Sequence, residues 1–190
     1  MTAFIPSHIE LAHAYWKSFL QIGDGAIDAT CGNGQDALYL AKILLKGNLI
    51  CLDIQKEAIE KTRIHLKRHL DANQFKKITL LNQCHSEFPV VDFPIKLVVY
   101  NLGYLPGGDK DLTTEAYKSI KSVGKALTLL MPGGGLSITC YPGHEEGERE
   151  EKDLLAFIST LDPKAFRVCH HCYPNSSKAP SLLLIQKKHL

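Results

Sequence analysis

Short apolar runs alternate with amphipathic stretches along almost the whole chain, and this alternation restricts the folds open to it. A strand, a helix and another strand form the unit from which parallel sheets are built. The pattern predicts strands at 25–29, 48–53, 77–82, 95–101, 135–141, 165–172 and 181–187, and helices at 8–20, 34–45, 55–71, 114–130 and 146–160. We therefore expect an α/β fold, with a seven-stranded, mostly parallel sheet and helices on both faces.

The end of the chain departs from this alternation. Only residues 173–180, which include two prolines, separate the last two predicted strands. A connection of this length cannot carry a crossover helix, so the sheet is expected to finish with an antiparallel hairpin. With 190 residues, of which 45% are hydrophobic, the chain has the size and composition of one domain, which we expect to span residues 1–190.

Residues 28–37, with the sequence DATCGNGQDA, run from the first predicted strand into the second predicted helix. In open α/β sheets, ligands bind at the carboxyl ends of strands, where the strand order reverses. Glycines in this loop let the backbone approach a ligand closely, and Asp53 ends the next strand at the same edge. The candidate cofactor-binding residues are Asp28, Thr30, Gly32, Asn33, Gly34, Gln35 and Asp53.

Two cofactors compete for this loop. The spacing of Gly32, Gly34 and Ala37 fits the relaxed fingerprint of dinucleotide-binding proteins, and Asp53 follows about 20 residues later, as that fingerprint requires. However, a carboxylate at Asp28 would repel a pyrophosphate. The ammonium and sulfonium groups of S-adenosyl-L-methionine suit such an acidic loop, so we favour this cofactor. An NAD-type oxidoreductase remains an alternative, as does an Asp28 that merely caps the following helix.

Residues 101–110, with the sequence NLGYLPGGDK, follow the strand predicted at 95–101 and should lie at the same sheet edge. Asn101 and Tyr104 have the layout of the Asn-Pro-Pro-Tyr turn of methyltransferases that act on amino groups. An Asn oxygen and a backbone carbonyl can accept the two hydrogens of an amine, while the aromatic ring holds the acceptor in place. The amine lone pair then points at the methyl donor. The stretch therefore predicts a site that positions a nitrogen for methylation.

An aliphatic amine acceptor would need help to lose its proton. With a pKa of ~10.4, it becomes neutral at pH 7 only at a cost of roughly 4 to 5 kcal/mol. Tyr141 and His144 follow the strand predicted at 135–141 and are expected on the same rim as Asp109 and Lys110. We expect His144 or Asp109 to accept or relay the proton. Alternatively, His144 caps the helix that follows it.

Five segments together resemble a known family. They are DATCGNG at 28–34, DIQKEAI at 53–59, NLGYLPGGDK at 101–110, YPGHEEG at 141–147, and Asn175 with Pro180. The chain resembles, from about residue 5 to 187, the tRNA 5-(aminomethyl)-2-thiouridine methyltransferases, formerly described as rRNA methylases. The resemblance implies a Rossmann-like class I methyltransferase that methylates the aminomethyl nitrogen of the tRNA wobble uridine, with S-adenosyl-L-methionine as donor. The alternative is methylation of another nitrogen, in rRNA, a protein or a small amine.

The resemblance also implies roles for individual residues. The residues it implies for cofactor binding are Asn33, Gln35, Asp53, Gln55, Cys84, His85 and Asn101. The catalytic residues it implies are Asn101, Tyr104, Asp109 and His144. The substrate contacts it implies are Lys110, Tyr141 and Asn175. The chain departs from the family at two places. Gln35 stands where a His or Asn is expected, and the loop at 175–180 lacks a second amide.

The net charge of +2 excludes a strongly basic protein that wraps nucleic acid, but one segment is basic. Residues 56–77 hold seven Lys and Arg side chains against three acidic ones. These charges form either the solvated face of a helix or a surface that contacts phosphates. In the second case we expect Lys67 and Arg68, or Lys110, to contribute to binding of the tRNA anticodon arm.

Other signals concern location, metals and assembly. The chain shows neither a signal-peptide pattern nor a run of about 18 apolar residues, so we expect a cytoplasmic protein without a membrane span. Its six scattered cysteines favour reduced thiols over a disulfide framework. CHHC at 169–172 resembles half of a zinc site, but no second ligand pair follows at suitable spacing, so no metal is expected. The aromatic-rich first helix or the terminal strands could join two copies in a homodimer.

Overall fold

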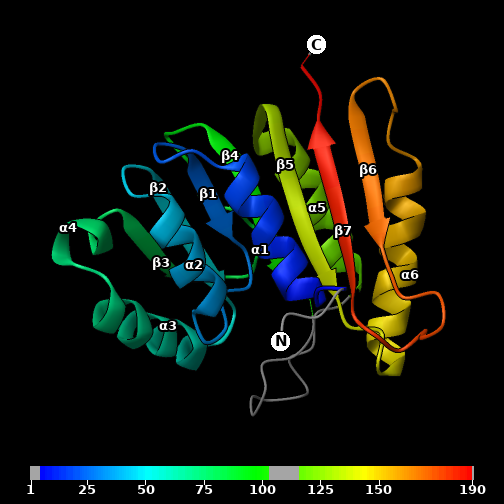
Figure 1. Cartoon of the computed structure of the whole chain (residues 1–190), viewed down its shortest axis with the longest axis horizontal. Helices are drawn as coiled ribbons and strands as arrows, with labels where there is room; N and C mark the ends of the chain where they lie inside the picture. Colours follow the sequence, from blue (N-terminus) through cyan, green and yellow to red (C-terminus); the bar gives the residue numbers. More distant parts are fainter. Residues whose placement is uncertain (1–4, 103–115, 190) are drawn as a thin grey trace.

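Seven strands form a single sheet in the order β3-β2-β1-β4-β5-β7-β6 (Figure 1). The computed structural model describes residues 5–102 and 116–189. The strands are β1 (Gly25–Asp28), β2 (Asn48–Asp53), β3 (Ile78–Asn82), β4 (Ile95–Asn101), β5 (Leu130–Cys140), β6 (Phe166–His171) and β7 (Ser181–Lys187). β7 is antiparallel to both of its neighbours, and the other strand pairs are parallel. The predicted fold class, with its antiparallel end, is confirmed.

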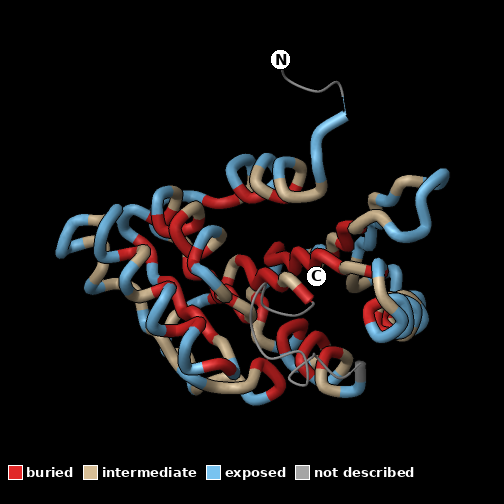
Figure 2. Tube along the Cα trace, turned by 90° about the horizontal axis from the view of Figure 1, so that it is seen from below, coloured by how far each residue is buried: buried red, intermediate tan, exposed pale blue. Residues whose placement is uncertain are grey.

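Helices cover both faces of this sheet, and each face has its own hydrophobic core. The helices in the described residues are α1 (His8–Phe19), α2 (Gln35–Ile43), α3 (Lys56–His69), α4 (Ala72–Phe75), α5 (Ala116–Leu129) and α6 (Glu145–Ser159). One core contains Trp16, Leu40 and Leu66 from α1, α2 and α3. The other contains Val123 and Leu154 from α5 and α6. Buried residues accordingly follow the sheet and the inner sides of the helices (Figure 2).

Two boundaries differ from the sequence-based expectation. The helix predicted at 55–71 ends at His69, because Leu70 is extended, and Asp71 then starts the separate short helix α4 with its own capping box. β5 begins at Leu130 rather than at 135, since Leu130 already pairs with Ile95 of β4. Residues 131–134, between the predicted helix and the predicted strand, are therefore part of β5. The pairing of β4 with β5 is irregular there, with a register shift between Ile95 and Leu97.

The strand order reverses between β1 and β4, which are direct neighbours. Asp28 at the end of β1 lies beside Val99 of β4, two residues before Asn101. Because both strands run in the same direction, the glycine loop after β1 and the segment after β4 leave the sheet at the same edge. The end of β5 and the β6–β7 loop reach this edge too, since Cys140 pairs with Ser181. This is where open α/β sheets bind their ligands.

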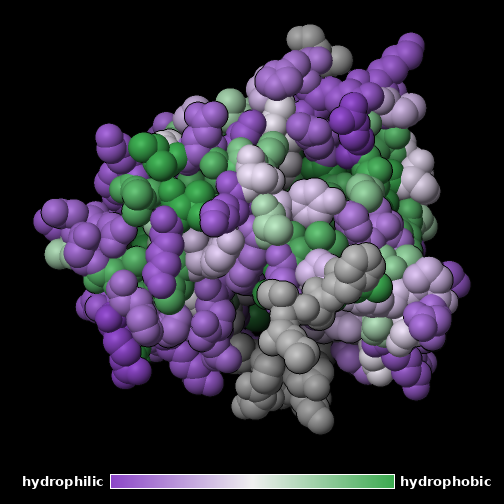
Figure 3. All heavy atoms as spheres, viewed as in Figure 1, coloured by the Kyte–Doolittle hydropathy of each residue, from purple (hydrophilic) through white to green (hydrophobic). Residues whose placement is uncertain are grey.

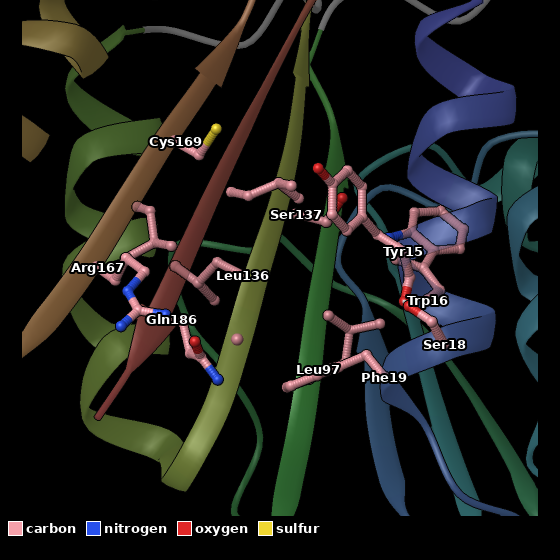
Figure 4. A pocket seen from close by; sticks show the side chains of 13 residues that line it. Tyr15, Trp16, Ser18, Phe19, Leu97, Leu136, Ser137, Arg167, Cys169 and Gln186 are labelled. Carbon is pink, nitrogen blue, oxygen red and sulfur yellow. The ribbon is translucent and has the colours of Figure 1, made fainter. Parts of the chain in front are cut away.

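The sheet face next to α1 is only partly covered. Tyr15, Trp16 and Phe19 of α1 lie across from β5 and β7 along a groove of about 280 Å³ (Figure 4). Polar side chains predominate on this side of the molecule, and hydrophobic ones are visible in separate patches (Figure 3). None of the predicted site residues that the structure describes lines this groove. Within residues 5–102 and 116–189, no helix combines the length and the apolar character needed to cross a bilayer.

The glycine loop provides a test of the fold. Gly34 has φ +82°, and a Cβ at this position would lie 3.0 Å from Thr62 Cα. We expect Gly34→Ala to lower the free energy of unfolding by about 1 to 3 kcal/mol, since an L residue is strained in this conformation. Thermal and urea unfolding measure the change. Gly23→Ala is the matched control, because its Cβ would meet nothing within 4 Å. Equal stability of the two variants would contradict this account.

Candidate functional site

Asp28 is the buried acidic centre of the glycine loop, with 2% of its surface exposed. Its Oδ1 accepts a hydrogen bond from the Thr30 N–H at 3.2 Å. Its Oδ2 is buried and has no hydrogen-bond partner among the described residues. Burying a carboxylate with an unpartnered oxygen costs free energy, and natural proteins keep such groups mainly where a ligand uses them. Asp28 is not the cap of α2 that the sequence offered as an alternative, because the N-cap of this helix is Gly34 and no side chain of the described residues caps it.

Asp53 fixes the shape of the same loop. Its two carboxylate oxygens accept the N–H groups of Gly32 and Gln55, both at 2.9 Å. From the other side, Thr62 Oγ1 donates to the Gly32 carbonyl at 3.0 Å. Gly32 and Gly34 have φ values of 50° and 82°, in the left-handed region that favours glycine. The loop backbone is thus held open at the sheet edge, and Asn33 is exposed on it.

The loop is electrostatically suited to a cation. Burial raises the pKa of Asp28 well above its ordinary value, and the nearby carboxylates of Asp36 and Asp53 raise it further. Burial also raises the pKa of Asp53. A positively charged ligand would relieve this repulsion, whereas a pyrophosphate would add to it. The residues present therefore fit the sulfonium and ammonium groups of S-adenosyl-L-methionine and do not fit a dinucleotide.

Asn101 lies directly beside this loop. Its backbone N–H donates to Thr30 Oγ1 at 2.7 Å, which ties the end of β4 to the glycine loop. Its side-chain Nδ2 donates to Asp36 Oδ2 at the start of α2. The hydroxyl of Tyr141, which follows β5, donates to Asn101 Oδ1 at 3.1 Å. The structure thus brings three predicted residues, Thr30, Asn101 and Tyr141, into one hydrogen-bonded group.

Sequence reasoning missed three members of this group. Asp36 lies in the glycine-loop motif but was not singled out, and His8 and His13 lie on α1. His13 Nε2 is 2.6 Å from Asp36 Oδ1, and His8 Nε2 is 3.4 Å from the Tyr141 hydroxyl. A loop motif is recognised by the short, fixed spacing of its residues along the chain. Residues on different helices share no such spacing. Of the three, only Asp36 could have been noticed in the sequence, as an acidic residue in the first turn of the helix after the glycine loop.

His144 caps α6. Its Nδ1 accepts the Gly147 N–H at 3.1 Å, so the lone pair of this nitrogen is engaged. In the neutral ring the other nitrogen, Nε2, then carries the proton. The structure therefore shows the capping interaction that was the alternative to a proton-transfer role. A role in proton transfer remains a prediction, and it would require the cap to open or Nε2 to act as a donor.

The other predicted cofactor residues lie along the same edge. Gln55 is buried at the start of α3, and Gln35 is exposed at the start of α2. Cys84 Sγ lies 3.2 Å from Ser86 Oγ after β3. Burial lowers the pKa of His85 to about 4, with Lys118 adding to the effect, so this ring is neutral at neutral pH.

The predicted substrate contacts are placed only in part. Asn175 is exposed on the β6–β7 loop. Tyr104, Asp109 and Lys110 lie outside the described residues. A cavity of about 390 Å³ between α1 and the β6–β7 loop has His8 and Tyr173 in its wall. Since His8 also contacts Tyr141, this cavity adjoins the Asn101 group.

The structure also places the basic helix and the CHHC segment relative to the site. Lys67 and Arg68 lie in the last turn of α3, roughly 16 Å along the helix from its start at the site edge. In β6, the side chains alternate between faces, so Cys169 Sγ lies 3.4 Å from His171 Nε2 while His170 pairs with Glu151 of α6 at 3.7 Å. Within the described part of the chain, no three potential metal ligands cluster.

The capping role of His144 can be separated from a role in proton transfer. His144→Ala should lower the free energy of unfolding by about 1 kcal/mol through loss of the cap, and His144→Asn should retain most of it because Asn is a good capping residue. Thermal unfolding measures both. If the imidazole also relays a proton, both variants lose methyl-transfer turnover. Wild-type turnover in His144→Asn would leave the cap as the residue's function.

Comparisons with known proteins agree with this geometry. The profile of the family described as "Putative rRNA methylase" matches residues 49–187. The "tRNA (mnm(5)s(2)U34)-methyltransferase, chloroplastic" of Arabidopsis thaliana is 35% identical over 188 residues, which cover 94% of this chain and 69% of that protein.

Two solved structures are similar over nearly their whole length. A "putative rRNA-methylase" from Clostridium thermocellum has a TM-score of 0.91 at 34% identity, covering 97% of this chain and 100% of its own. A "putative methyltransferase" from Streptococcus mutans, solved in complex with SAH, has a TM-score of 0.83 at 30% identity, covering 97% and 99%. The matched profile spans most of β2 to β7, and the full-length similarities extend it to α1 and the glycine loop. The chain therefore belongs to the rRNA methylase family.

Proposed function

We propose that this protein is an S-adenosyl-L-methionine-dependent methyltransferase that modifies tRNA. In this proposal it converts 5-aminomethyl-2-thiouridine at the wobble position to 5-methylaminomethyl-2-thiouridine. The observation that carries the proposal is the Asn101 amide held beside a buried acidic glycine loop. Family membership and the SAH-bound relative support the cofactor, and the Arabidopsis relative supports the tRNA substrate.

S-adenosyl-L-methionine is the cofactor that the residues of the loop fit. Asp28 and the half-buried backbone at Gly32 would hold it, and Asp53 would add a carboxylate for a ribose diol, since each carboxylate oxygen can accept more than one hydrogen bond. When bound, this cofactor supplies a methyl group attached to a positively charged sulfur. The protein would contribute a negatively charged loop that orients it.

Asn101 would position the acceptor. Tyr141 uses one lone pair of Asn101 Oδ1, and the second is available to accept a hydrogen from an amine. Burial, together with the Asp36 carboxylate, raises the pKa of Tyr141 to about 12, so its hydroxyl stays protonated and keeps donating at neutral pH. An amine held by this oxygen keeps its lone pair free for attack on the methyl carbon. Positioning of this kind contributes a large share of the rate in such reactions.

The cavity beside His8 offers room for the acceptor nucleotide. It opens on the β5–β7–β6 side of Asn101, whereas the glycine loop lies on the β1 side. A nucleophile approaches a methyl group from the side opposite the leaving sulfur. The cavity and the glycine loop lie on different sides of the Asn101 amide, which supports a donor on one side and an acceptor on the other.

The proposal is tested by methyl transfer from radiolabelled S-adenosyl-L-methionine to tRNA that carries the aminomethyl group, with nucleoside mass spectrometry to identify the product. We expect the methylaminomethyl nucleoside with the wild type. Asn101→Ala should lower turnover about 10² to 10³-fold, the size of effect seen when a positioned transition-state contact is lost. tRNA without the aminomethyl group is the matched control substrate. Label that appears in rRNA or protein and not in tRNA would replace the proposed substrate with another nitrogen.

We expect the Asp28 carboxylate to lower the stability of the free protein and to strengthen cofactor binding. Because its pKa is raised in the folded protein, the folded state binds a proton more tightly than the unfolded state, and the stability falls as pH rises above the ordinary aspartate range. Asp28→Asn removes this penalty. The free variant should therefore melt a few degrees above the wild type at pH 8, with a smaller difference at pH 5. Thermal unfolding at both pH values measures this.

Calorimetry of cofactor binding completes the test. The wild type should bind S-adenosyl-L-methionine more weakly as pH falls and Asp28 becomes protonated, whereas Asp28→Asn should bind at least tenfold more weakly at pH 8 and depend less on pH. Unaltered affinity in the variant would remove Asp28 from the cofactor site.

A further inference from the structure

His13 and Asp36 belong to neither the cofactor set nor the acceptor set, yet they join Asn101 in a continuous chain. His13 Nε2 lies 2.6 Å from Asp36 Oδ1, and Asp36 Oδ2 accepts the hydrogen bond from Asn101 Nδ2. The side chains of His13 and Asp36 are only 22% and 12% exposed. The chain links α1, the start of α2 and the end of β4, which are far apart in sequence.

A carboxylate can distinguish the two ends of an amide. The χ2 torsion of an Asn side chain has a broad, nearly two-fold distribution. The amide can therefore present either its oxygen or its NH₂ group to a given neighbour. Asp36, when ionised, only accepts hydrogen bonds, so it must face the NH₂ end. The Asn101 oxygen is then directed to the opposite side, where the Tyr141 hydroxyl donates to it at 3.1 Å.

His13 in turn holds Asp36 in place. Its ring is stacked on Tyr39, with centroids 3.8 Å apart and an angle of 11° between the planes. The Tyr39 hydroxyl donates to the His13 backbone carbonyl at 3.1 Å. The Trp16 ring also contacts the His13 imidazole, with the two ring centroids 4.9 Å apart. The imidazole therefore contacts two aromatic rings, and Tyr39 also holds the His13 backbone, before the ring meets the carboxylate.

The orientation of the amide matters for the reaction proposed above. With its oxygen toward the acceptor, Asn101 receives a hydrogen of the amine and leaves the lone pair free. With its NH₂ group in the same place, it would donate a hydrogen bond to that lone pair and block the nucleophile. The two orientations have similar shapes, so packing alone discriminates weakly between them. A charged hydrogen-bond partner discriminates strongly.

We infer that His13 and Asp36 are positioning residues: their hydrogen-bonded contact holds the Asn101 amide in the orientation that directs Oδ1 toward the acceptor nitrogen. The inference rests on the proposed methyl transfer for its effect on rate. The orientation of the amide itself is independent of that reaction.

The test compares His13→Ala with His13→Gln, because a Gln side chain carries an amide N–H that can replace the Nε2–H of His13. At saturating tRNA and S-adenosyl-L-methionine, we expect kcat to fall about 10 to 100-fold in His13→Ala and to recover most of this loss in His13→Gln. The KM for tRNA and the affinity for SAH should each change less than about threefold. A purely structural role would instead lower the melting temperature of both variants without restoring kcat in His13→Gln.

The Asn101→Ala background is the matched control. If His13 acts through Asn101, adding His13→Ala to Asn101→Ala should cause little further loss of kcat. A full additional 10 to 100-fold loss, or wild-type kcat in His13→Ala, would overturn the inference.

A second readout needs no activity. In the ¹⁵N spectrum of the free protein, the side-chain NH₂ of Asn101 should give one well-dispersed pair of signals in the wild type and in His13→Gln. In His13→Ala the pair should shift toward the values of free amides or split into two sets. If the wild type transfers no methyl group to tRNA, the proposed function fails while this measurement still decides the inference. Unshifted signals in His13→Ala would refute it.

Discussion

The parallel pairing of β1 with β4 is the interaction on which the site depends. It places two segments that are about 70 residues apart in sequence next to each other, and the hydrogen bond from the Asn101 N–H to Thr30 Oγ1 fastens them at the sheet edge. Strand pairing in the middle of a sheet is rigid, because hydrogen bonds and packed side chains constrain it on both faces. A site built on such strand ends holds its groups with the accuracy that group transfer needs.

Around this junction the protein accumulates negative charge. Asp28 is buried with an unpartnered oxygen, and Asp36 and Asp53 lie near enough to raise its pKa further. Such an arrangement costs folding free energy, and a positively charged ligand would offset that cost. The hydrogen bonds of Asp36 and Asp53 limit the cost, since each of these carboxylates also orients a neighbouring group. The acidic cluster thus serves both the shape and the charge of the site.

The helices differ in what they contribute to this edge. α1 supplies the two imidazoles, at His8 and His13, that contact Tyr141 and Asp36. α6 starts at the same edge, and His144 caps its first turn. The most basic turn of α3 lies at the far end of its helix, and Lys67 is 5.5 Å from the ring centroid of Phe75 in α4. A charged face on a helix therefore says little about where a substrate docks until the direction of the helix is known.

Local pattern in the sequence determined the fold class and the glycine loop, because apolar periodicity and glycine act over a few neighbouring residues. The same locality explains the two missed boundaries, where the capping box of Asp71 and the pairing of Leu130 overrode the pattern. Only the tertiary structure decided that His13 meets Asp36, 23 residues away, and that Asp36 meets Asn101, 65 residues away. Such contacts depend on how α1 and α2 pack on the sheet, and packing is a property of the whole core rather than of any one segment.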